Sequence, residues 1–196
     1  MKATFFERLG AYVIDAFIVS IIFSLICMGV DTKETKTEKL MSELDTQLME
    51  KTITTEEYIK EYKILLYDYQ KESILTTSIS LALTIAYYIV FQYLNKGMTL
   101  GKKLLNLKIV DKNTEKEISI SRYILRSLLI YNLLSGIICI PLLYILNQTT
   151  FFIIYFILLT IEMLFILLST IFVLYRKDKR GLHDILTNTM VIKINN

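Results

Sequence analysis

An apolar run of 25 residues, from Phe151 to Tyr175, constrains the fold of this chain more than any other feature. Glu162 is the only charged residue in it. A helix needs roughly 20 apolar residues to cross a bilayer, so this run is long enough to span one. Hydrophobic residues make up 54% of the 196-residue chain, and its charged residues are segregated between the apolar runs. These features exclude an ordinary soluble domain.

Three further runs predict helices of the same kind. Together with 151–175, the predicted spans are 9–30, 74–94 and 123–146. Spans 123–146 and 151–175 are separated only by the polar residues 147–150, which predicts that they form a tight antiparallel pair. The expected fold class is therefore an all-α membrane protein with four transmembrane helices, forming a single membrane domain over residues 1–196.

The distribution of charge predicts how these helices are oriented. The loop 96–122 and the tail 176–196 carry an excess of Lys and Arg, whereas the segment 31–73 is acidic. Because a Lys/Arg excess marks the cytoplasmic side, we expect a multi-pass plasma-membrane protein with both termini in the cytoplasm. The same segregation explains the net charge of +3, so no nucleic-acid partner is predicted.

The two long connecting segments predict different structures. Segment 31–73 contains helical apolar stripes and a capping-box pair, Thr54 and Glu57, which predicts an extracellular helical hairpin whose second helix continues into the next span. Such a hairpin could bind a partner or, as the pattern favours, cap the bundle. In the middle loop, 107–110 alternates like a strand, as does 190–194 in the tail, and 118–120 could add a third strand. A small cytoplasmic β element is therefore expected.

Glu162 is the first candidate site residue. It has 11 residues of the run before it and 13 after it, so a spanning helix would place it near the midplane of the bilayer. A carboxylate there costs on the order of a few kcal/mol unless it is protonated, paired or hydrated. Asn132 and Ser135 are among the polar side chains at a similar depth. Two interpretations have equal weight: a titratable carboxylate lining a cation path, and a protonated side chain bonded to hydroxyl groups.

Asp15 is the second candidate, and it lies near the start of the first span. Burial disfavours the charged form of a carboxylate and so allows its protonation to be switched. Asp15 could therefore be a proton or cation site. The favoured alternative is a structural ion pair with Arg126, which enters the third span at a similar depth. Hydrogen bonding of Asp15 to the backbone at the membrane edge is a further alternative.

Three segments, 5–19, 87–111 and 176–194, together resemble the RDD family of bacterial integral membrane proteins, named for an arginine and two aspartates. The family's arginine and first aspartate correspond to Arg8 and Asp15, and the remaining aspartate corresponds to Asp184, next to His183. A glycine-Thr-x-Gly-Lys element of the family matches the residues Gly97, Thr99, Gly101 and Lys102. Asn106 departs from the pattern, which leads us to expect glycine.

The resemblance implies a plasma-membrane protein and, less strongly, monovalent cation/proton antiport. The competing hypothesis is an accessory or regulatory protein that binds a partner membrane protein. The expected partners are the lipid bilayer and, because four helices are few for a transporter, further copies of the chain in a homo-oligomer.

The His183-Asp184 pair could shuttle protons, although a role in docking or in starting a helix is favoured. The sequence contains no catalytic, cofactor or metal motif, so we expect neither an enzyme nor a cofactor nor a metal site.

Overall fold

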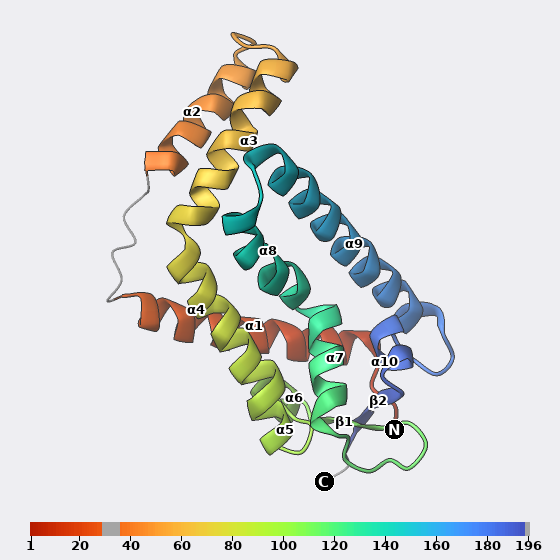
Figure 1. Ribbon diagram of the computed structural model, residues 1–196. Coiled ribbons are helices and arrows are strands. Elements are labelled where there is room, and N and C mark those ends of the chain that lie inside the picture. Colours follow the sequence, from red (N-terminus) through yellow and green to blue (C-terminus); the bar gives the residue numbers. More distant parts are fainter. Residues whose placement is uncertain (29–35, 195–196) are drawn as a thin grey trace.

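The computed structural model describes residues 1–28 and 36–194, which are mostly helical (Figure 1). In chain order the elements are α1 (Phe5–Cys27), α2 (Lys36–Met49), α3 (Thr55–Glu72), α4 (Ile74–Ile85), the π-helix η1 (Ala86–Phe91), α5 (Gln92–Leu94), α6 (Leu100–Leu104), β1 (Leu107–Asp111), α7 (Ile120–Ile130), α8 (Leu133–Ile145), α9 (Gln148–Tyr175), α10 (Leu182–Leu186) and β2 (Thr189–Lys193).

Within residues 1–28 and 36–194, three helical segments are long and apolar enough to cross a membrane: α1, the continuous run from α4 to α5, and α9. The pair α7 and α8 would add a fourth span if it is counted as one. The prediction of a multi-pass helical protein is therefore confirmed at this level. The predicted end of the first span and the start of the acidic segment, residues 29–35, lie outside the described residues.

The third predicted span differs from a single helix. It is divided into α7 and α8, whose axes meet at 77°. Between them, Asn132 adopts the left-handed conformation with φ 52°, which asparagine tolerates better than most residues other than glycine. Pro141 lies inside α8 and not at the break. An apolar run predicts burial in lipid, but it does not reveal such a bend.

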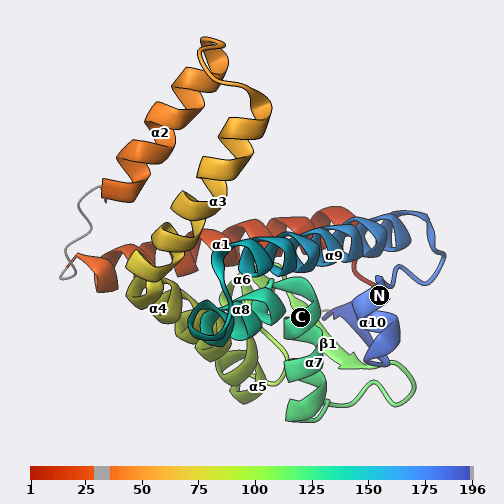
Figure 2. The same ribbon diagram turned by 45° about the horizontal axis from the view of Figure 1, so that its top comes forward.

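The predicted helical hairpin is present over the described residues of the acidic segment, where α2 and α3 pack against each other and α3 also packs against α9 (Figure 2). The predicted capping box is also confirmed. The Thr54 hydroxyl accepts a bond from the Glu57 amide at 3.2 Å, and the Glu57 carboxylate accepts one from the Thr54 amide at 2.9 Å. Only Ser73 separates α3 from α4, so the hairpin leads directly into the second span.

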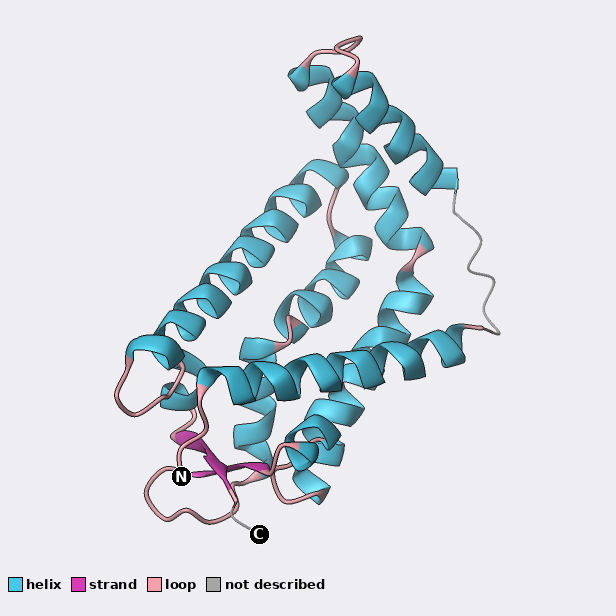
Figure 3. Cartoon of the chain, turned by 180° about the vertical axis from the view of Figure 1, so that it is seen from behind, coloured by secondary structure: helices cyan, strands magenta, loops and turns pink. Residues whose placement is uncertain are grey.

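The small sheet has two antiparallel strands, with β1 from the middle loop paired to β2 from the tail. Lys2 forms a further bridge to Ile192, so the sheet also holds the N-terminus (Figure 3). The possible third strand at 118–120 is not formed, because Ser119 occupies the N-cap position of α7 and Ile120 begins that helix. At Asn106, where glycine was expected, φ is 56°, in the left-handed region that glycine favours.

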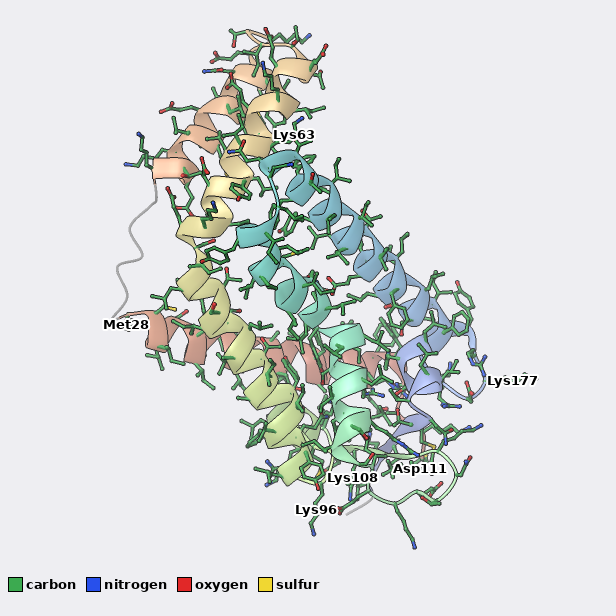
Figure 4. All side chains as sticks on the ribbon, viewed as in Figure 1. Met28, Lys63, Lys96, Lys108, Asp111 and Lys177 are labelled. Carbon is green, nitrogen blue, oxygen red and sulfur yellow. The ribbon has the colours of Figure 1, made fainter. Side chains whose placement is uncertain are left out.

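The sheet and the hairpin lie at opposite ends of the molecule, which we call the sheet end and the hairpin end. Figure 4 shows Lys63 at the hairpin end, and Lys96, Lys108 and Asp111 at the sheet end. A buried apolar cluster that includes Ala3, Leu107, Ile109, Tyr123 and Val191 joins the sheet to α1 and α7. This cluster fixes the position of the charged side chains described next.

Candidate functional site

Asp15 lies on α1 with only 1% of its surface exposed, and it accepts three hydrogen bonds. The Tyr87 hydroxyl donates to Oδ1 at 2.6 Å, the Thr99 hydroxyl to Oδ2 at 2.5 Å, and the Gly101 amide to Oδ1 at 2.7 Å. These donors come from η1 and from the segment that starts α6. Both carboxylate oxygens are thus engaged, and Asp15 joins α1 to the second span and to α6.

The glycines of the glycine-Thr-x-Gly-Lys element are required by close backbone approaches. A Cβ at Gly101 would overlap the carbonyl oxygen of Ala11 and lie 2.9 Å from Cγ of Asp15. Gly97 has φ +94°, and a Cβ there would lie 2.5 Å from the carbonyl oxygen of Ile109. α6 therefore packs directly against α1, which brings the Gly101 amide within reach of Asp15.

Asp184 is the centre of a second polar cluster. It is on α10 and completely buried, and Arg8 Nη1 donates to it at 2.6 Å. Arg126 Nη1 donates to its other oxygen. The Gly181 amide and the Thr189 hydroxyl donate at 3.1 Å and 3.3 Å. The arginine and the second aspartate of the family motif are therefore ion-paired across 176 residues of sequence.

The structural pair that we favoured for Asp15 is not the one formed. Arg126 pairs with Asp184 and also donates to the Thr189 hydroxyl at 2.8 Å. The reason is geometric: α10 lies against α7, while α6 supplies uncharged donors to Asp15.

The environment of this cluster fixes the charges of its members. Burial by itself would raise the pKa of the Asp184 carboxyl, but Arg126, Arg8 and the other neighbouring donors together outweigh that effect and hold the pKa well below its usual range. Burial lowers the pKa of the His183 imidazole to about 3, so this ring is neutral at physiological pH. His183 Nδ1 lies 2.6 Å from the Ser169 hydroxyl of α9, which attaches α10 to the last span.

Five of the predicted charged or titratable residues line one cavity of about 350 Å³ at the sheet end, between α1, α7 and α9. They are Arg8, Asp15, Lys102, Arg126 and His183. Asp184 lies directly behind Arg8 and Arg126. The structure thus brings together the residues of the family motif, although they come from three distant parts of the sequence.

Glu162 is not part of this cluster. It lies on α9 with 7% of its surface exposed, and its Oε1 accepts the backbone N–H of Ser135 at 2.9 Å. Ser135 is in the first turn of α8, so Glu162 caps a helix that begins inside the bundle. Its Oε2 is buried and has no hydrogen-bond partner among the described residues.

A second cavity, of about 430 Å³, lies beside this cap. Ser135 and Cys139 of α8 line it, and hydroxyl-bearing side chains of α4 face them. The polar lining includes Ser73, Thr76, Thr77, Ser80, Thr84, Asn132 and Ser135. The α4 members recur at helical spacing, so one side of an otherwise apolar helix is polar.

Sequence reasoning missed several members of the two clusters. Tyr87 carried no charge pattern that would mark it as a partner of Asp15. Arg180 donates to the backbone oxygens of Thr189 and Asp184 at 2.8 Å each, whereas the sequence pattern shows it only as one of the basic residues of the tail. Its place in the tail segment of the motif was the available signal. Among the described residues, no group of three His, Cys, Asp or Glu side chains could hold a metal ion.

Long apolar helices with a buried charged cluster at one end define a multi-pass helical membrane protein. A sequence model of the RDD family matches residues 2–188, so the chain belongs to the RDD family. No curated protein and no solved structure matches the chain.

Proposed function

We propose that this protein exchanges a monovalent cation for protons across the membrane, with Glu162 as the carboxylate that carries them. One observation supports the proposal above the others: Glu162 is buried at the N-terminus of α8, where the bend between α7 and α8 interrupts a span. In many secondary transporters, discontinuous helices near the midplane of the bilayer form the sites for substrate and coupling ion.

The two oxygens of Glu162 have different surroundings. Oε1 is held by the Ser135 amide, while Oε2 has no partner among the described residues. A proton or cation can therefore bind at Oε2 without breaking the cap. The cavity that Ser135 lines contains hydroxyl oxygens from Ser80, Thr84 and other side chains of α4, which are suitable ligands for a small cation that has lost part of its water.

Asp15 is not the carrier in this proposal, although its place in the first span makes it a candidate proton or cation site. Three donors occupy both carboxylate oxygens of Asp15. Freeing one of these oxygens to accept a proton would require breaking the contact between α1 and α6. Asp15 is accordingly assigned to positioning, and Glu162 alone to transport. A homo-oligomer with both termini in the cytoplasm remains part of the proposal, because four spans are few for a transporter.

The test is reconstitution of the purified full chain into liposomes that contain a trapped pH-sensitive dye. A pulse of sodium or potassium is expected to change the internal pH. Glu162→Gln should abolish the response, because glutamine keeps an acceptor for the Ser135 amide but removes the charge. Glu61→Gln makes the same chemical change at an exposed position of α3 and should leave the response intact. A wild-type chain that moves no protons, or an unaltered response in Glu162→Gln, contradicts the proposal.

A second candidate function, binding of a partner membrane protein, has one observation in its favour. The α2–α3 hairpin projects from the bundle and exposes the apolar side chains of Leu40, Met49, Ile59 and Ile64. A photo-crosslinker at Met49 in native membranes is then expected to give one discrete adduct whose mass differs from twice that of the chain. Labelling of lipid alone would argue against this function.

A further inference from the structure

The cavity at the sheet end contains more positive than negative charge. Three basic side chains line it, Arg8, Lys102 and Arg126, together with one carboxylate, Asp15. The second carboxylate nearby, Asp184, is shared between Arg8 and Arg126. When Lys102 is protonated, three cations therefore face two carboxylates in this buried setting, and an anion in the cavity would balance the excess.

Hydrogen bonding shows which donors are still free to bind an anion. Asp15 uses its oxygens for uncharged donors, so it does not neutralise a basic side chain through a direct bond. Arg8 Nε is buried without a hydrogen-bond partner among the described residues. In the amide orientation of Gln92 that satisfies both of its ends, its oxygen accepts from Lys102 Nζ at 2.6 Å, which gives Lys102 a neutral partner only.

The surroundings of Lys102 indicate the same deficit of negative charge. Burial lowers the pKa of its ammonium to about 7, and repulsion by Arg126 adds to the effect, against the opposing influence of Asp15 and Asp184. A negatively charged ligand beside Lys102 would offset the effects of burial and of Arg126, and so would favour the protonated ammonium.

The rest of the cavity is apolar and borders the surface that faces lipid. Leu9 and Tyr12 of α1 are 43% and 48% exposed and form part of its lining. Leu129, Ile166 and Val173 continue the apolar lining on α7 and α9. Figures 1 and 3 show the N-terminal part of α1 and the C-terminal end of α9 meeting beside α10. A fitting ligand therefore has an anionic head and an apolar body.

We propose that this cavity binds the phosphate headgroup of an acidic membrane phospholipid, with Arg8, Lys102 and Arg126 around the phosphate and the acyl chains lying along α1 and α9. Basic pockets between transmembrane helices are known sites for acidic lipid headgroups. A volume of about 350 Å³ is sufficient for a phosphoglycerol group, since ligand pockets begin at roughly 300 Å³. A zwitterionic headgroup would bring its own cation and leave the excess positive charge in place. This proposal is independent of cation transport.

The test uses the full chain in non-ionic detergent, titrated with phosphatidylglycerol or phosphatidylcholine, with bound lipid counted by native mass spectrometry. One phosphatidylglycerol per chain is expected to bind saturably at concentrations where phosphatidylcholine does not. Lys102→Gln should weaken this binding about fivefold, the effect of one basic contact near a lipid surface. Lys103→Gln removes the neighbouring charge, which is exposed and does not line the cavity, and should have no effect.

Two further arms separate the alternatives. Thr170→Phe narrows the cavity from α9 without changing its charge and should also weaken phosphatidylglycerol binding, which guards against an effect of Lys102→Gln on folding alone. Inorganic phosphate and glycerol phosphate are added as competitors. Displacement of the lipid by either at an equal concentration would identify a site for soluble phosphate and overturn the lipid assignment. Equal binding of the two lipids, or equal effects of Lys102→Gln and Lys103→Gln, would overturn the anion site itself.

Discussion

At the scale of single residues, Asp184 has the largest predicted effect on stability. Asp184→Asn removes the charge that pairs with both Arg8 and Arg126 and leaves those guanidinium groups buried. Breaking a buried pair in this way costs about 3–5 kcal/mol. We expect that loss in the free energy of unfolding, measured by denaturant titration in detergent micelles at neutral pH.

The matched control is Asp178→Asn, which removes a more exposed ion pair with Arg176. Such surface pairs contribute about 0–1 kcal/mol. Similar losses in the two variants would contradict the central position that the structure gives to Asp184.

His183 predicts a pH dependence of stability. Its folded pKa of about 3 lies below the ordinary value of 6.5, so the unfolded chain binds a proton that the folded chain rejects. The contribution of His183 to the free energy of unfolding is therefore fully present above about pH 6.5, and it is lost as the pH falls toward the folded pKa. Between pH 6.5 and 5 the loss amounts to about 2 kcal/mol.

Because His183 is the only histidine in the chain, His183→Gln should flatten the stability profile over this interval. The measurement is the unfolding midpoint at half-unit steps of pH, for both proteins. A wild-type profile that is already flat would show that the ring is protonated in the folded protein.

The residues of both clusters could be predicted from the sequence more readily than their pairing. Arg8, Asp15 and Asp184 are recognisable as members of a motif, and Arg126 as a charge at the edge of a span. Which carboxylate Arg126 meets depends on where α10 packs, and α10 is 58 residues further along the chain at Asp184. Spacing along one helix does not determine such a contact.

At the scale of elements, the packing of α6 on α1 predicts different outcomes for two glycines. Gly101→Ala would force a methyl group into the Ala11 carbonyl oxygen, a backbone atom that cannot move independently of its helix. We expect a destabilisation of about 3 kcal/mol or more, at the upper end of the usual cost of overpacking. The variant should also weaken the bond between the Gly101 amide and Asp15.

Gly136→Ala in α8 is the matched control. Its Cβ would lie 3.2 Å from Cδ1 of Leu81, the end of a flexible side chain. Alanine also favours a helix over glycine by about 1 kcal/mol. The expected change in unfolding free energy is therefore small, and a larger loss here than at Gly101 would argue against the close approach of α6 to α1.

The elements also show which local features the sequence contains. The capping box at Thr54 and Glu57 predicted the start of α3 because its two bonds form within four residues. The break at Asn132 is different, since the partner that stabilises the start of α8 is Glu162, on another helix. Both residues were visible as polar interruptions, but their contact depends on how α8 and α9 pack.

At the scale of the whole molecule, the separation of the charged ends predicts the topology in the membrane. The hairpin end derives from the acidic segment, and the sheet end from the basic middle loop and tail. Since a Lys/Arg excess stays in the cytoplasm, single cysteines at Lys60 on α3 and at Lys177 after α9 should lie on opposite sides. Both positions are exposed, whereas the native Cys27 and Cys139 are buried.

A membrane-impermeant maleimide applied to intact cells should therefore label Lys60→Cys and leave Lys177→Cys unlabelled until the membrane is permeabilised. The unsubstituted chain gives the background from the two native cysteines. Labelling of Lys177→Cys in intact cells would show that the orientation is the reverse of the predicted one. The phosphate-binding cavity would then face the outer leaflet, because Arg8, Lys102 and Arg126 all lie at the sheet end. The same experiment thus determines which leaflet supplies the proposed lipid.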